Sequence, residues 1–108
     1  VTLSDGSTRN GYEIKILNKR GETRLFWIET EDLPGALLTV ASSGDRPKES
    51  LLVEVEADSV RGVKIFVTVP PAQLTDERTE FAFRITALRG AEATLTATQF
   101  VAPQQALK

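Results

Sequence analysis

The residues of this chain that could carry out chemistry are mostly carboxylates, because several of the usual reactive side chains are missing. The 108 residues include no Cys, no His and no Met. A chain without Cys has no disulfide, no thiolate nucleophile and no iron–sulfur ligand. A chain without His lacks the usual general base and the commonest metal ligand, and one without Met lacks a thioether for copper. We therefore expect no catalytic residues, no metal site and no cofactor in this chain.

The densest group of acidic side chains lies beside a Pro-Gly turn and consists of Glu29, Glu31 and Asp32. Carboxylate oxygens suit hard cations such as calcium and magnesium, so a hard-metal or copper(II) relay is an alternative function. The cluster lacks the spacing of a calcium-binding loop, which favours solvated strand-end charges. Glu54 and Glu56 alternate along one segment, as is typical of the wet face of a sheet, and give a glycosidase pair no specific support.

The charge balance limits the partners of this chain. Its 13 basic and 15 acidic residues give a net charge of −2. Nucleic-acid binders need a basic surplus for phosphate contacts, and so do polybasic membrane patches, so neither class is expected. No apolar run approaches the roughly 18 residues of a membrane span. Because the chain starts at Val1, we expect it to be a piece of a longer protein.

The elements that position these side chains are predicted to be strands. Short segments of alternating apolar and polar residues recur about every ten residues, which is typical of an all-β sandwich or barrel. Turn residues separate them, including Gly21, which we expect to supply a positive φ, and the Pro-Gly and Pro-Pro pairs. The predicted strands span 12–17, 24–30, 36–41, 51–56, 63–69, 81–88 and 93–98.

About seven antiparallel strands favour a single immunoglobulin-like β-sandwich over residues 1–108, with a small barrel as the alternative. The chain lacks the Cys and Trp pattern of antibody domains. A helical turn is expected near 72–74 and a tight hairpin turn at Arg89-Gly90. Residues 104–108 are expected to form a frayed tail.

Four large apolar residues alternate with the predicted core positions and should therefore lie on outer faces: Leu25, Trp27, Leu52 and Phe66. Neighbouring strands would gather some of them into an exposed apolar patch, which often marks a protein-binding surface. Two alternatives stay open. In one, Trp27 belongs to the core because the strand register differs by one residue; in the other, the terminal segments cover the patch.

The last predicted strand is rich in Thr and is a candidate sheet edge. A partner strand added to that edge would be a second route to binding, which a Pro at Thr96 should block. Tyr12, in the first predicted strand, is expected to be half-buried with its hydroxyl bonded to backbone.

Several short motifs also follow one another along nearly the whole chain. They are Asp5-Gly6-Ser7, Arg9-Asn10, Tyr12, Lys15 to Lys19, Leu33-Pro34-Gly35, Asp58 to Arg61, Phe66 to Pro71 and Phe100 to Pro103. In this order they resemble the C-terminal domain of the FixG family, the cytochrome c oxidase accessory proteins. The motif residues expected to be structural are Asn10, Tyr12, Asn18, Pro34, Gly35, Pro70 and Pro71.

The resemblance implies a parent protein embedded in the bacterial inner membrane by several transmembrane helices, with ferredoxin-like Cys motifs for iron–sulfur clusters. Family members help to assemble the cbb-type haem-copper oxidase by reducing copper for delivery. This chain would be the immunoglobulin-like domain after the last membrane helix, facing the periplasm. None of the family's redox cysteines falls in this stretch, so no catalytic residue is carried over.

The resemblance therefore implies a non-catalytic interaction or structural domain. Its expected partner is an oxidase subunit, a copper chaperone or the membrane portion of its own parent, and not a nucleic acid. The alternative is a generic bacterial surface β-sandwich, an adhesin or a carbohydrate-binding module. Saturable sugar binding that quenches Trp27 fluorescence would favour that alternative.

Overall fold

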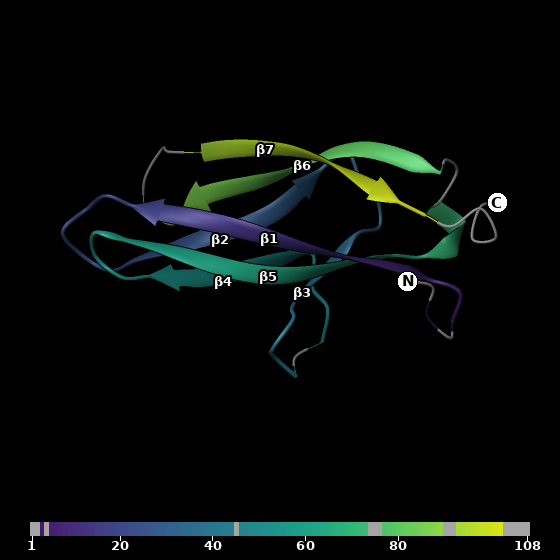
Figure 1. The fold of residues 1–108 in the computed structure, drawn as a ribbon, viewed down its shortest axis with the longest axis horizontal. Helices are drawn as coiled ribbons and strands as arrows, with labels where there is room; N and C mark the ends of the chain where they lie inside the picture. Colours follow the sequence, from purple (N-terminus) through teal and green to yellow (C-terminus); the bar gives the residue numbers. More distant parts are fainter. Residues whose placement is uncertain (1–2, 4, 45, 74–76, 90–92, 103–108) are drawn as a thin grey trace.

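The computed structural model describes residues 3, 5–44, 46–73, 77–89 and 93–102, which form two antiparallel sheets (Figure 1). The strands are β1 (Thr8–Asn18), β2 (Arg24–Glu31), β3 (Leu37–Val40), β4 (Ser50–Val55), β5 (Ser59–Val69), β6 (Arg78–Ala87) and β7 (Ala93–Val101), and η1 (Pro71–Gln73) is a short 3-10 helix. One sheet has the order β1-β5-β3 and the other β4-β2-β6-β7. The predicted immunoglobulin-like sandwich is confirmed, since the strands form two separate sheets rather than a closed barrel.

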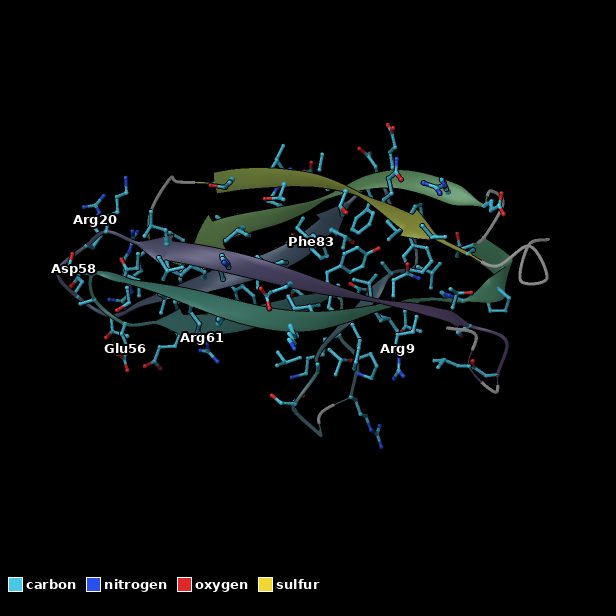
Figure 2. The ribbon with its side chains drawn as sticks, viewed as in Figure 1. Arg9, Arg20, Glu56, Asp58, Arg61 and Phe83 are labelled. Carbon is cyan, nitrogen blue, oxygen red and sulfur yellow. The ribbon has the colours of Figure 1, made fainter. Side chains whose placement is uncertain are left out.

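The core lies between the two sheets and follows the period-two alternation of the strands. On β5, Val63, Ile65, Val67 and Val69 are buried while the intervening Lys64 is exposed. The same alternation buries Phe26 and Ile28 on β2, and Phe81, Phe83 and Ile85 on β6. Phe83, which is labelled in Figure 2, is one of these buried residues. Within the described residues, no helix is long and apolar enough to cross a membrane.

Several strands are longer than the alternation predicted, among them β7, which continues to Val101. β1 begins at Thr8 rather than at Tyr12, and its ladder with β5 runs from Thr8 opposite Val69 to Asn18 opposite Ser59. β5 and β6 likewise begin several residues early. Backbone pairing needs no apolar side chain, so polar strand ends continue a ladder without giving a hydropathy signal.

The turns also differ from the prediction at Gly21. Among the described residues, positive φ occurs at Gly6, Gly35, Asp32 and Asp58, and not at Gly21. Asp tolerates the left-handed region because its short side chain bonds locally, so Asp32 and Asp58 adopt a positive φ that was expected only at Gly21. The predicted turn at Gly90 and the tail at 104–108 lie outside the described residues. The helical turn is present as η1, one residue earlier than expected.

One end of the sandwich is held by a cluster of turn residues from distant parts of the chain. Gly35 has a φ of 78°, and a Cβ there would lie 2.8 Å from Cγ of Gln73 and 3.5 Å from Cδ of Pro70. A Cβ on Gly6 would lie 3.4 Å from Cγ of Pro71. The Pro34-Gly35 turn therefore packs closely on η1, and the Pro-Gly and Pro-Pro motif residues act together as a structural unit.

Gly35→Ala is expected to lower the free energy of unfolding by about 1–2 kcal/mol, because alanine is strained at positive φ and its methyl group would displace the Gln73 side chain. Gly21→Ala is the matched control, since Gly21 has no positive φ and no atom within 4 Å of a built Cβ. Urea denaturation of both variants measures the difference. Equal stability of the two variants would contradict the close packing.

Candidate functional site

The outer face of the β4-β2-β6-β7 sheet carries an apolar pair. Trp27 on β2 lies directly opposite Leu52 on β4. Leu52 is 47% exposed, whereas Trp27 and Leu25 are half-buried. Since Phe26 is buried beside them, the register predicted for β2 is confirmed, and the alternative that placed Trp27 in the core is wrong. We call Leu25, Trp27 and Leu52 the outer apolar face.

A hollow of about 490 Å³ adjoins this face where the β3–β4 connection passes beside Trp27. Arg46 and Lys48 line it together with Leu52. The connection is held in place because the backbone N–H of Leu38 donates to the carbonyl of Lys48 at 2.6 Å, and that of Lys48 donates to Leu38 at 2.8 Å. The outer apolar face is therefore bordered by two basic side chains from an anchored loop.

Phe66 does not join the outer apolar face, which corrects the expectation of a single patch. It lies on β5 opposite Gly11 and Thr39, in the β1-β5-β3 sheet. Its neighbours Ile65 and Val67 point into the core, so Phe66 points away from the core on the other side of the sandwich. The predicted surface is thus split between two opposite faces, and only Trp27 and Leu52 are direct neighbours.

The Phe66 ring is covered by a cation. The guanidinium carbon of Arg9 lies 4.4 Å from the ring centroid, a distance typical of a cation–π contact. A Cβ on Gly11 would lie 3.4 Å from the ring, so the ring packs beside β1. Phe66 is consequently half-buried and belongs to the surface packing of its own sheet.

The edge strands β1 and β7 are joined at one end by side-chain bonds to backbone. The Asn10 amide donates to the carbonyl of Val101 at 2.9 Å, and its Oδ1 accepts from the Val101 N–H at 3.3 Å. The Tyr12 hydroxyl donates to the carbonyl of Gln99 at 2.7 Å. The half-buried Tyr12 and its backbone bond are as predicted. Both motif residues therefore connect β1 of one sheet to β7 of the other.

Burial raises the pKa of Tyr12 to about 12. The ring also makes edge contacts with Phe81 and Phe83, at centroid distances of 5.6 and 5.3 Å. Tyr12 is therefore a packed, protonated hydrogen-bond donor at neutral pH rather than a general base.

A pH titration should show this directly, because Tyr12 is the chain's only Tyr. The tyrosinate absorbance of the native chain is expected to appear near pH 12, against about pH 10 in denaturant. Since the folded pKa lies above the unfolded one, the stabilisation is complete below about pH 10 and is lost as the pH rises toward 12. Tyr12→Phe should remove this loss, whereas a native midpoint near 10 would contradict the burial.

At its other end the space between β1 and β7 opens into a groove of about 540 Å³. β1 contributes Lys15, Ile16 and Leu17 to its walls, and β7 contributes Thr94 and Thr96. The remaining lining residues are Lys19, Arg20, Arg24, Phe26, Ile85 and Ala87. Sequence reasoning did not find this groove; the only signal for it was the Thr-rich composition of β7.

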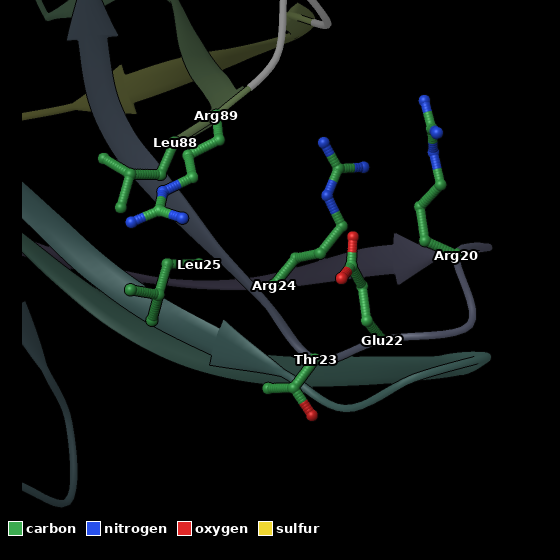
Figure 3. A pocket seen from close by; sticks show the side chains of 7 residues that line it. All are labelled: Arg20, Glu22, Thr23, Arg24, Leu25, Leu88 and Arg89. Carbon is green, nitrogen blue, oxygen red and sulfur yellow. The ribbon is translucent and has the colours of Figure 1, made fainter.

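A second, smaller hollow of about 410 Å³ shares Arg20 and Arg24 with the groove. Figure 3 shows these two arginines extending to one side of the ribbon, and Arg89 lying above Leu25. Glu22 also lines this hollow. The lining of the two hollows is therefore mainly basic, although the chain as a whole is slightly acidic.

Within the described residues, the acidic side chains near the Pro34-Gly35 turn are not grouped as metal ligands. The Glu31 carboxylate makes a salt bridge with Arg84, and Glu29 lies opposite the same arginine in the β2–β6 ladder. No group of three acidic side chains within the described ranges is placed to hold a cation. Glu54 and Glu56 are exposed, as expected for the wet face of a sheet.

Comparison with known protein families gives one match that spans most of the chain. The family described as "IG-like fold at C-terminal of FixG, putative oxidoreductase" matches residues 1–103.

Two curated proteins and one solved structure are also similar. The nitrogen fixation protein FixG of Rhizobium meliloti is 35% identical over 82 residues, and protein RdxA of Cereibacter sphaeroides is 36% identical over 70 residues. The aligned parts cover 76% and 65% of this chain but only 16% and 14% of those proteins. The crystal structure of a FixG-related protein from Vibrio parahaemolyticus has a TM-score of 0.73 at 18% identity, over 89% of this chain and 80% of that one; this likeness concerns the fold.

Proposed function

This chain belongs to the family of immunoglobulin-like domains at the C-terminus of FixG, and on that basis we propose that it is a non-catalytic interaction and structural domain. Its parent would be a membrane-bound iron–sulfur protein that assists the assembly and copper supply of the cbb-type cytochrome c oxidase. The domain would be held on the periplasmic side of the inner membrane by the transmembrane helices of the parent. The family match over residues 1–103 is the observation that carries this proposal.

The chemistry of the described surface supports a role in binding rather than in catalysis. The Tyr12 hydroxyl is engaged with backbone, and the Glu31 carboxylate is engaged with Arg84. The sequence offers no Cys or His for electron or proton transfer. Family membership also favours this function over that of an adhesin or a carbohydrate-binding module. The proposed partners are an oxidase subunit, a copper chaperone or the parent's own membrane portion.

Deleting residues 1–108 from the parent tests the proposal in a bacterium that depends on the cbb-type oxidase. We expect oxidase activity in membranes to fall and added copper to restore it in part, while the iron–sulfur signals of the truncated parent persist. Full oxidase activity without the domain would overturn the proposed role.

The proposed location has an independent test because the chain contains no Cys. Glu54→Cys, at an exposed strand position, adds one thiol that a membrane-impermeant maleimide can reach only from the periplasmic side in intact cells. Labelling before lysis is the expected result. Labelling only after lysis would place the domain in the cytoplasm.

The outer apolar face is the docking surface that follows from the sequence prediction. The double variant Trp27→Ala, Leu52→Ala in the parent is expected to lower oxidase activity about tenfold, since buried aromatic anchors dominate interface energies. Val60→Ala is the control, because Val60 is 58% exposed on the other sheet. Normal oxidase activity in the double variant would remove the outer apolar face from the docking model.

A further inference from the structure

The groove lies between β1 and β7, which are edge strands of different sheets. β1 ends one sheet and β7 ends the other. Asn10 and Tyr12 join the two strands at one end, and the groove separates them at the other. Edge strands carry backbone groups that can pair with an added strand, so this end presents a template for an extended peptide.

Among the described residues, no side chain fills the inner side of β7 along this groove. Thr94 lies opposite Ile85, and Thr96 lies opposite Phe83, so both threonines project to the side of the sheet that carries the core. Both are nevertheless exposed, whereas Phe100, on the same side of the same strand, is 1% exposed. Apolar side chains are missing from positions where a sandwich normally buries them.

The chemistry of the groove identifies what would fill those positions. Its floor is apolar and includes Ile16, Phe26, Ile85 and Ala87. Its rim is basic, with Lys15, Lys19, Arg20 and Arg24. Glu22 lies beside the two arginines in the adjoining hollow, and the described residues that line the groove itself include no carboxylate. The guanidinium of Arg24 lies over the Phe26 ring at 5.6 Å from the centroid, where the basic rim meets the apolar floor.

We propose that this groove binds an extended acidic segment of a partner protein, which pairs with the β7 edge. Every second side chain of the segment would be apolar and enter the groove, because side chains alternate with period two along a strand. Its acidic residues would face the basic rim. This inference rests on the proposed function as an interaction domain and specifies the chemistry of the partner.

A second copy of the chain fits this groove less well than an acidic partner. The sequence of β7 contains no acidic residue, so two copies joined edge to edge through β7 would bring two basic rims together. Like charges at an interface oppose association. An acidic segment from another protein neutralises the rim instead.

The test uses an eight-residue peptide of four Val-Glu repeats, titrated into the isotope-labelled 108-residue chain by NMR. We expect amide shifts in β7 and in the groove end of β1, and an affinity that falls as salt is raised from about 0.02 M to about 0.5 M. A peptide of four Val-Lys repeats should not bind. Shifts confined to β4, or equal binding of both peptides, would overturn the proposal.

Paired variants locate the site on one side of β7. Thr96→Phe fills the groove and should weaken binding of the Val-Glu peptide at least about tenfold. Ala97→Phe adds the same ring at an exposed neighbour that points to the opposite face and should change affinity less than about twofold. Equal effects of the two variants would overturn the groove as the binding site.

Charge reversal tests the rim in the same way. Lys15→Glu with Lys19→Glu should weaken binding at least about tenfold, while Lys64→Glu, an exposed lysine outside the groove, should leave it within about twofold. Concentration-dependent dimerisation that Thr96→Phe abolishes would assign the groove to a second copy and overturn the acidic partner.

Oxidase activity in cells that carry variants of the full-length parent distinguishes a failure of this inference from a failure of the proposed function. If deletion of the domain impairs the oxidase but Thr96→Phe does not, the proposed function stands and the groove proposal is overturned. If the Val-Glu peptide binds as expected but deletion leaves the oxidase unaffected, the groove is supported and the oxidase role fails.

Discussion

Replacing Phe83 with alanine is expected to lower the free energy of unfolding by about 4 kcal/mol, a large share of the ~5–15 kcal/mol of a typical domain. Phe83 is 2% exposed and lies between the sheets. Its ring makes edge contacts with Phe81 at 5.1 Å and with Tyr12 at 5.3 Å. Truncation would therefore leave a cavity at the point where β6 meets β1. Urea denaturation followed by the fluorescence of Trp27, the chain's only Trp, measures the loss.

Phe66→Ala is the matched control, because it removes the same ring from an outer face. Its ring contacts Arg9 and the β1 backbone rather than the core, so we expect a loss of about 1 kcal/mol. Equal costs for the two substitutions would mean that Phe66 is part of the core. A small cost also makes Phe66→Ala usable in cells, where any loss of oxidase activity would then report on binding rather than on folding.

The face on which each strand residue lies could be predicted well from the sequence. Leu25, Trp27 and Leu52 lie on the outer face because their neighbours Phe26 and Val53 are buried, and successive side chains of a strand point to opposite faces. The same rule placed Phe66 correctly on an outer face. It could not say which sheet that face belongs to, because sheet membership depends on pairings between strands that are distant in sequence.

The groove could not be predicted for a related reason. The alternating pattern predicts only that Thr94 and Thr96 lie on the same face of a strand. Whether they are buried depends on whether another strand covers that face. The separation of β1 and β7 arises from the whole arrangement of both sheets, including the bonds from Asn10 and Tyr12 that hold only one end. The predicted Tyr12 bond was correct in kind, but its acceptor, the Gln99 carbonyl, is 87 residues away.

Asn18→Ala is expected to lower the free energy of unfolding by about 3 kcal/mol, because it leaves one buried and several partly buried backbone groups without their partner. Asn18 is 1% exposed at the end of β1. Its amide nitrogen lies 2.8 Å from the carbonyl oxygen of Glu22 and 3.1 Å from those of Val55 and Glu56. Its Oδ1 accepts the backbone N–H of Arg20 at 3.1 Å. One side chain thus ties the β1–β2 turn to the end of β4.

Two further variants separate this polar network from simple packing. Asn18→Asp keeps the shape and the acceptor for Arg20 but replaces the amide donor with a carboxylate oxygen that faces three carbonyl oxygens. At neutral pH it should therefore cost at least as much as Asn18→Ala. Asn10→Ala, which removes more exposed bonds to Val101, should cost only about 1 kcal/mol. If the Asn18→Asp variant were as stable as the unsubstituted chain, the hydrogen bonds donated by Asn18 would not be what stabilises this end of the sandwich.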